Sequence, residues 1–166
     1  MTTLKQFASL TTMLIVASAA PAEAEGSFLP DGLFVSLGGG LVGTSLRDDD
    51  DRATGGIFSA KLGVPFVEVA AIEAQVDWIP DGDAYVVTVQ ERMPLLLDLG
   101  PVEPYVVAGI GWGEFGRSTQ FALRAGGGID FRVAENVAIG LDVTHVFLFE
   151  GVVDYTSFVF GARYGF

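Results

Sequence analysis

The residues of this sequence that could do chemistry are few and lie far apart. Four consecutive carboxylates stand between Arg47 and Arg52, namely Asp48, Asp49, Asp50 and Asp51. Oxygen ligands of this kind suit Ca²⁺, but the run lacks the spaced ligands and the central glycine of a dedicated calcium loop. We therefore interpret the run as a solvated loop and predict no dedicated metal-binding residue. Divalent cations could still bridge its carboxylates to anionic partners.

His145 is the single histidine and the one candidate for a general base. There is no cysteine, which excludes disulfides, thiolate zinc sites and cysteine nucleophiles, and one histidine excludes a multi-histidine metal site. The glycine runs 38–40 and 126–128 are not phosphate loops, because no helix N-terminus follows them. We predict no catalytic residue and no cofactor.

Composition sets the class of molecule. The 166 residues are 50% hydrophobic and only 18% charged, with a net charge of −12, and a chain of this length forms one domain. No basic cluster is present, so nucleic acid is not expected as a partner.

The first 24 residues are predicted to be a signal peptide. Lys5 is followed by an apolar stretch from Leu10 to Ala20, which is too short to cross a membrane as a helix. Ala22-Glu23-Ala24 has the small residues of a cleavage site, so we expect cleavage after Ala24, with Ala22 as the alternative. Residues 25–166 then form the mature domain.

The mature chain alternates between apolar and polar or small residues with the period of a β-strand. Turn residues divide it into strands near 33–42, 56–65, 69–79, 84–96, 104–113, 119–132, 137–149 and 153–166. With about ten residues each, these fit tilted transmembrane strands. We predict an all-β fold, an eight-stranded antiparallel up-and-down transmembrane barrel, because closure removes the edges that lipid would not tolerate.

The polar face of these strands is sparse, of mixed charge and interleaved with glycine, which is typical of a barrel interior. The residues assigned inward are Ser36, Lys61, Glu73, Gln75, Asp77, Thr88, Gln90, Arg92, Arg124, Asp130, Arg132, Asp142, Thr144, Ser157 and Arg163. Lys61, Glu73, Asp77, Arg92, Arg124, Asp130, Arg132, Asp142 and Arg163 are predicted to pair as a lumenal charge network. A turn centred on Val67 would place Lys61 opposite Glu73. Inward glycines such as Gly63, Gly128 and Gly140 would make room for the long side chains.

Aromatic residues gather near both ends of the predicted strands, as in the girdles of membrane barrels. Those near the loop ends are Trp78, Tyr85, Trp112, Phe121, Phe147, Phe149 and Phe158, and those near the turn ends are Phe66, Phe131, Tyr164 and Phe166.

Two segments carry a family resemblance. Residues 104–113, Pro-Tyr-Val-Val-Ala-Gly-Ile-Gly-Trp-Gly, resemble the Pro-Tyr-x-x-x-Gly-x-Gly strand of small bacterial outer-membrane β-barrel proteins. Residues 124–142 resemble the hairpin that follows it there, and the C-terminal Tyr164 and Phe166 resemble the signal read by the outer-membrane assembly machinery. Nearly the whole mature chain is similar to the eight-stranded, porin-like barrels of the outer-membrane protein A and X type.

The resemblance implies a monomeric barrel in the outer membrane of a Gram-negative bacterium, in contact with its lipids and lipopolysaccharide. It also implies that both termini face the periplasm. The departures are the long acidic connection from Thr44 to Gly55, and Glu91 and His145 at positions that strict alternation points to lipid.

Some barrels of this type trim lipid A with a His–Ser pair on the outer face. Here Val146 and Phe147 follow His145, and Ser157 on the next strand is expected to face inward, so no dyad is evident. We predict a structural or surface-interaction protein that supports the envelope and makes contacts through residues 44–55. The alternative is a narrow channel, and a lipid A-modifying enzyme is the third candidate.

Overall fold

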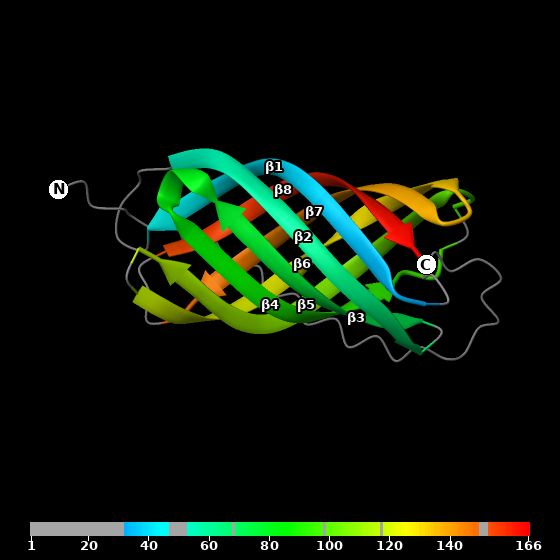
Figure 1. Cartoon of the computed structure of the whole chain (residues 1–166), viewed down its shortest axis with the longest axis horizontal. Helices are drawn as coiled ribbons and strands as arrows, with labels where there is room; N and C mark the ends of the chain where they lie inside the picture. The colour runs from blue at the N-terminus through cyan, green and yellow to red at the C-terminus, as the bar shows by residue number, and fades with distance from the viewer. Residues whose placement is uncertain (1–31, 47–52, 68, 98, 117, 150–152) are drawn as a thin grey trace.

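The computed structural model describes residues 32–46, 53–67, 69–97, 99–116, 118–149 and 153–166. Within them, eight strands form one closed antiparallel barrel in which each strand pairs with its neighbours in sequence and β1 pairs with β8 (Figure 1). The elements are β1 (Phe34–Leu46), β2 (Ala53–Val67), β3 (Ala70–Ile79), the 3₁₀ turn η1 (Pro80–Gly82), β4 (Ala84–Pro94), β5 (Val102–Phe115), β6 (Ser118–Ala134), β7 (Val137–Leu148) and β8 (Val153–Gly165). The predicted up-and-down barrel is confirmed.

The described part of the chain contains no helix long and apolar enough to cross a membrane. The predicted signal peptide, residues 1–24, lies outside the described residues, so its cleavage after Ala24 stays a prediction.

The barrel has two ends, which we name by their connections. The turn end holds the start of β1, the C-terminus and the connections β2–β3, β4–β5 and β6–β7. The loop end holds the other four connections between strands (Figure 1). The strands are tilted and coil around a long barrel, because the twist of each strand and the staggered register of a closed sheet require it.

Strand β3 shows why these residues form such a wall. Glu73, Gln75 and Asp77 are buried, whereas the alternating Ile72 and Val76 are 44% and 43% exposed. Successive strand residues point to opposite faces, so polar groups face the interior and apolar groups face outward. This pattern is the reverse of a soluble barrel.

Strands β1 and β2 run further than the sequence pattern predicted. Thr44 pairs with Ala53, and the Thr44 hydroxyl donates to the Ala53 carbonyl at 3.3 Å. The predicted connection from Thr44 to Gly55 therefore narrows to residues 47–52.

The acidic run of the sequence falls inside this shorter connection. Its members, Asp48, Asp49, Asp50 and Asp51, lie outside the described residues. Their predicted role as a surface-contact loop that divalent cations could bridge therefore stays a prediction.

The predicted pairing of Lys61 with Glu73 is wrong. Lys61 pairs with Gln75, and Glu73 lies opposite Gly63. The hairpin turns tightly enough for Val67 to pair with Ala70, and an irregularity between Pro65 and Val67 then shifts the register. The error comes from the position of the turn, because the pairing of Val67 with Ala70 centres it later in the chain than Val67.

Close packing inside the barrel depends on glycine at a few inward positions. A methyl group added at Gly63 would collide with the Phe34 ring, and one at Gly128 would meet the Tyr105 hydroxyl. At Gly140 it would overlap the Asp130 carboxylate. These glycines give long side chains their space, as the sequence analysis expected.

The outer wall carries aromatic residues near the loop end. The ring centroids of Phe58 and Trp78 lie 5.7 Å apart, and those of Trp78 and Tyr85 lie 6.3 Å apart, both pairs stacked. Phe121 and Phe149 form a second pair at 5.6 Å. Rings at this level match the girdles of membrane barrels.

Candidate functional site

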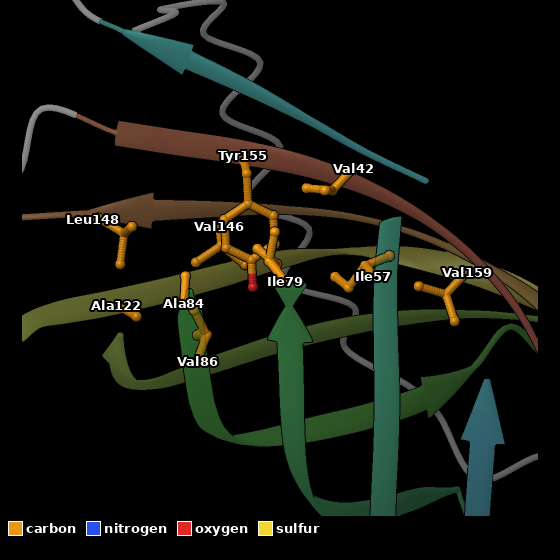
Figure 2. Packing of buried hydrophobic residues seen from close by; sticks show 10 residues of the cluster. All are labelled: Val42, Ile57, Ile79, Ala84, Val86, Ala122, Val146, Leu148, Tyr155 and Val159. Carbon is orange, nitrogen blue, oxygen red and sulfur yellow. The ribbon is translucent and has the colours of Figure 1, made fainter. Parts of the chain in front are cut away.

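The interior next to the loop end is filled by apolar side chains. Figure 2 shows them pointing toward one another across the barrel. Seven strands supply this loop-end cluster, and Phe115 of β5 packs against it. Its members are Val42, Ile57, Ile79, Ala84, Val86, Ala122, Val146, Leu148, Tyr155 and Val159. These side chains fill the described interior at this level.

Arg124 lies beneath this cluster and is fully buried. Its guanidinium pairs with the Asp77 carboxylate, and it donates to the hydroxyls of Thr88 at 3.1 Å and Thr144 at 3.0 Å. The Tyr155 hydroxyl donates to the same Asp77 carboxylate at 2.9 Å. A buried charge is stable only when it is paired and hydrogen-bonded, and both conditions are met here.

Ion pairs continue toward the turn end. Asp130 accepts from Arg92 at 2.7 Å and also pairs with Arg163, so one carboxylate joins two arginines. Lys61 donates to Asp142 at 2.7 Å. All of these residues except Arg92 line a small cavity of about 20 Å³, enough for about one water molecule.

Arg92 is held by an aromatic ring as well as by acids. Its guanidinium carbon lies 3.4 Å from the centroid of the Tyr105 ring, and its Nη2 atom is 3.3 Å from Glu103. Arg92 Nε and Nη1, Glu73 Oε1 and Gln90 Oε1 are buried without a protein hydrogen-bond partner. Hydrogen bonding is therefore less complete here than around Arg124.

The structure places most of the predicted charge network inside the barrel. Lys61, Glu73, Asp77, Arg92, Arg124, Asp130 and Arg163 are buried, and the side chain of Asp142 is 14% exposed. Arg132 is exposed, unlike the other members of the network. It keeps the inward register of Asp130 but lies near the end of β6, where the barrel opens.

Several buried polar residues were missed by the sequence analysis, namely Ser59, Glu103, Tyr105, Asp154 and Tyr155. Tyr105 shares the strand parity of the inward Gly109, and Tyr155 shares that of Ser157. Alternation alone could have found both tyrosines. Glu103 was assigned to a connection, because β5 begins earlier than its sequence pattern suggests.

The outer wall holds the two residues that departed from the family pattern. Glu91 is exposed and His145 is partly exposed, each between buried neighbours, so both face outward as alternation indicated. His145 Nδ1 lies 2.8 Å from the Thr156 hydroxyl, and the His145 ring meets the edge of Phe147 at 4.3 Å. Ser157 is buried and lies 2.9 Å from the Thr144 hydroxyl, away from His145.

No group of three or more His, Cys, Asp or Glu side chains that could hold a metal occurs among the described residues. Tyr164 and Phe166, the predicted assembly signal, form an edge-to-face pair at 5.0 Å and are 44% and 72% exposed. They stand beside each other at the turn end of β8.

A family model supplies the decisive comparison. The model of the outer membrane protein beta-barrel domain matches residues 8–166. The chain belongs to this family. No protein of curated function matches it by sequence.

Solved structures share the fold at low sequence identity. Neisserial surface protein A is 17% identical, with a TM-score of 0.69 over 81% of this chain and 97% of its own. The N-terminal β-barrel domain of Pseudomonas aeruginosa OprF is 12% identical, with a TM-score of 0.63 over 82% and 99%. Yersinia pestis Ail, the attachment invasion locus protein, was solved with the heparin analogue sucrose octasulfate; it is 16% identical, with a TM-score of 0.57 over 81% and 98%.

The family and these neighbours make the chain an outer-membrane β-barrel protein. Its exposed apolar wall therefore faces lipid. The identities are too low to carry a binding partner from any neighbour to this chain.

Proposed function

We propose that this barrel has a passive role in the outer membrane, supporting the envelope and making surface contacts through residues 47–52, and that it is neither an open pore nor an enzyme. The observation that carries the proposal is the filled interior. Apolar side chains close its loop end, and paired charges occupy the rest. An eight-stranded barrel is just wide enough to be filled in this way.

A filled interior argues against general diffusion of solutes. Ions would have to pass the side chains of Ile79, Val86 and Leu148, which are 3% exposed or less, and an apolar constriction disfavours water and ions. The narrow channel stays as the alternative. It is tested by planar-bilayer recording on the purified full chain, where we expect no steady conductance.

Surface contact is assigned to the acidic connection because binding residues concentrate on loops carried by a rigid scaffold. The Ail neighbour was solved with a sulfated sugar analogue, which gives a precedent for sugar recognition on this fold. With four carboxylates at residues 48–51, direct contact with a sulfated sugar would be repulsive. A divalent cation that bridges carboxylate and anionic sugar removes that repulsion.

The test replaces Asp48, Asp49, Asp50 and Asp51 with asparagine in the full chain, which keeps the length of the connection. We expect unchanged folding, seen as heat-modifiable gel mobility, and weaker Ca²⁺- or Mg²⁺-dependent binding to lipopolysaccharide-coated surfaces. Glu135→Gln, an exposed charge at the turn end, is the control. Equal binding by both variants would remove the acidic connection from the proposal.

An enzyme is the second candidate, and one observation favours it. The imidazole of His145 lies within hydrogen-bond distance of a hydroxyl on the lipid-facing wall, and such a pair can activate a nucleophile. The hydroxyl belongs to Thr156 rather than to serine. The chain would have to release fatty acid from purified lipid A for this candidate to replace the passive role.

A further inference from the structure

The register of the sheet connects the two outer-wall residues that depart from the family pattern. Glu91 of β4 lies opposite Ala108 of β5, which lies opposite Ala125 of β6. Ala125 in turn lies opposite His145 of β7, whose partner on β8 is Thr156. We call these five residues the polar line. Strand pairing therefore places Glu91 and His145 three strands apart, with only two alanines between them.

The middle of the polar line carries the smallest side chains of this part of the wall. Ala108 and Ala125 are exposed and end at their Cβ atoms. Toward the loop end, the next outward pair is Ile110 with Leu123, which are 56% and 37% exposed. Toward the turn end, the next outward residue of β6 is Gly127. In a membrane, small residues allow the backbone of a partner to approach closely.

Glu91 has no partner within the described barrel. Its side chain is exposed on the lipid-facing wall, and the described residues give its carboxylate no hydrogen bond or ion pair. The residues opposite it on the neighbouring strands are Ile72 and Ala108, and neither has a polar side chain. Ionisable residues inside a membrane pair with a partner or line a polar cavity. The carboxylate therefore requires a partner from outside the described barrel.

The depth of Glu91 in the membrane restricts what this partner is. Tyr85, which stacks on Trp78 in the loop-end girdle, precedes Glu91 on β4. At about 3.4 Å per residue and a tilt of about 40°, Glu91 lies roughly 15 Å from that girdle along the membrane normal. The apolar band of such barrels is about 25 Å tall, so the carboxylate lies roughly 10 Å inside its other edge. Lipid head groups lie beyond that edge, out of reach of a glutamate side chain.

We propose that the polar line is the binding surface for another integral membrane protein, whose membrane-spanning segment carries a lysine or arginine that pairs with Glu91. A protein backbone holds a cation at this depth, which a lipid head group does not reach. The buried cations of this chain point inward, and the exposed Arg132 lies near the end of β6. A second copy of the described barrel therefore brings no cation to the level of Glu91.

The far end of the polar line supplies a second polar contact. His145 uses Nδ1 for the Thr156 hydroxyl, which leaves Nε2 of the ring for the partner. Three strand spacings separate His145 from Glu91, which is about 14 Å. The inference rests on the membership of the outer-membrane barrel family and not on the surface-contact role of residues 47–52.

A model peptide tests the charge requirement. The probe is a membrane-spanning helix of about 20 leucine and alanine residues, with one lysine a third of the way along it and a dansyl group at its centre. The control peptide has leucine in place of the lysine. Each is mixed with the full chain folded in phosphatidylcholine vesicles. Trp112, which shares β5 with Ala108, is the energy donor, and Trp78 is replaced with phenylalanine.

We expect the emission of Trp112 to fall several times more with the lysine peptide than with the leucine peptide. The difference should disappear in Glu91→Gln. Glu114→Gln, which removes another exposed carboxylate of the wall near the loop end of β5, is the control and should keep the difference. Equal energy transfer to both peptides, or a difference that survives Glu91→Gln, would overturn the proposal.

Two further measurements test the other occupants. Stronger quenching of Trp112 by brominated phosphatidylethanolamine than by brominated phosphatidylcholine, lost in Glu91→Gln, would assign Glu91 to a lipid ammonium group and overturn the proposal. Because the chain has no cysteine, Ala125→Cys reports contact between copies. Disulfide-linked dimers that Glu91→Gln abolishes would assign the polar line to a second copy and also overturn it.

The stability of the barrel alone gives an independent readout. Glu91→Leu should raise the urea midpoint for unfolding from vesicles, because it removes an unpaired charge from the lipid-facing wall. A lower midpoint would show that the carboxylate stabilises the barrel itself, and the proposal would fall. None of these variants changes residues 47–52, so this proposal and the surface-contact role fail separately.

Discussion

The two halves of the barrel interior are filled by opposite chemistry. Toward the loop end, aliphatic side chains and Tyr155 meet in one cluster. Toward the turn end, ion pairs cross the lumen between strands that are not neighbours, as in Lys61 of β2 with Asp142 of β7 and Arg92 of β4 with Asp130 of β6. Side chains fill both halves of the described interior.

The difference separates two tasks. Apolar contacts have no direction, so the loop-end cluster closes the barrel and tolerates changes of shape. Ion pairs require defined partners and geometry, so the charged half ties distant strands together and penalises a slipped register. Arg124 joins the halves, because it pairs with Asp77 and lies 3.3 Å from the hydroxyl of Tyr155 in the apolar cluster.

The largest expected effect follows from removing the charge at this junction. Arg124→Leu leaves the fully buried Asp77 without its cation, and breaking a buried pair from one side costs about 3–5 kcal/mol. We expect a clearly lower urea midpoint for unfolding from lipid bilayers, measured by tryptophan fluorescence. Arg132→Leu is the control and should shift the midpoint less, because Arg132 is exposed and the interactions of exposed charges contribute about 0–1 kcal/mol. Equal shifts of the midpoint in the two variants would mean that the buried partners of Arg124 add nothing to the stability of the barrel.

A somewhat smaller effect is expected in the apolar half. Leu148→Ala removes a fully buried side chain, and such truncations cost about 2–5 kcal/mol according to how far the site collapses. Leu148→Met keeps the volume and should cost less than about 1.5 kcal/mol. The urea midpoints of the two variants are compared in the same bilayers. Equal decreases of the midpoint for Leu148→Met and Leu148→Ala would contradict the tolerance to changes of shape that we infer for the apolar half.

The sequence was sufficient for the barrel and for most of its inner face. Alternation places Glu73, Asp77 and Arg92 inside without any knowledge of their partners, because a strand residue has only two faces to choose from. The choice between lumen and lipid followed from the chemistry of the faces. Strand number followed from turn residues and strand length.

Partnership across the lumen could not be derived in the same way. Lys61 was assigned to Glu73 from a turn centred on Val67, but Val67 itself pairs with Ala70, and Gln75 lies opposite Lys61. The ion pair of Lys61 forms with Asp142 of β7. Which side chains meet depends on barrel stagger, a property of all eight strands together. Parity also does not say where the barrel opens to water, so it did not show that Arg132 is exposed.

A third variant tests how far the charged half depends on a single hydrogen bond from an uncharged donor to a carboxylate. Tyr105 donates its hydroxyl to Asp142, which also accepts from Lys61. Tyr105→Phe removes only the hydroxyl, and hydrogen bonds to charged groups contribute about 1.5–3 kcal/mol. We expect a loss in that range or below it, because Lys61 remains and the ring still covers Arg92. The urea midpoint is compared with that of Lys61→Met, which should fall further. A larger loss for Tyr105→Phe would make the tyrosine, not the lysine, the main partner of Asp142.

The smallest effect is expected on the outer wall, where the polar pair of His145 and Thr156 contrasts with every pair inside. Its two atoms lie 2.8 Å apart, but both residues are partly exposed and neither needs a charged partner, so the bond contributes about 0.5–1.5 kcal/mol. Thr156→Val removes the hydroxyl and keeps the branched shape that suits a strand. We expect a small decrease of the urea midpoint. The double variant with His145→Ala should fall no further than His145→Ala alone, because the two substitutions remove the same bond. The same variants, assayed on purified lipid A, should release no less fatty acid than the unsubstituted chain. Activity lost in both would make the pair catalytic and replace the passive role proposed for the barrel.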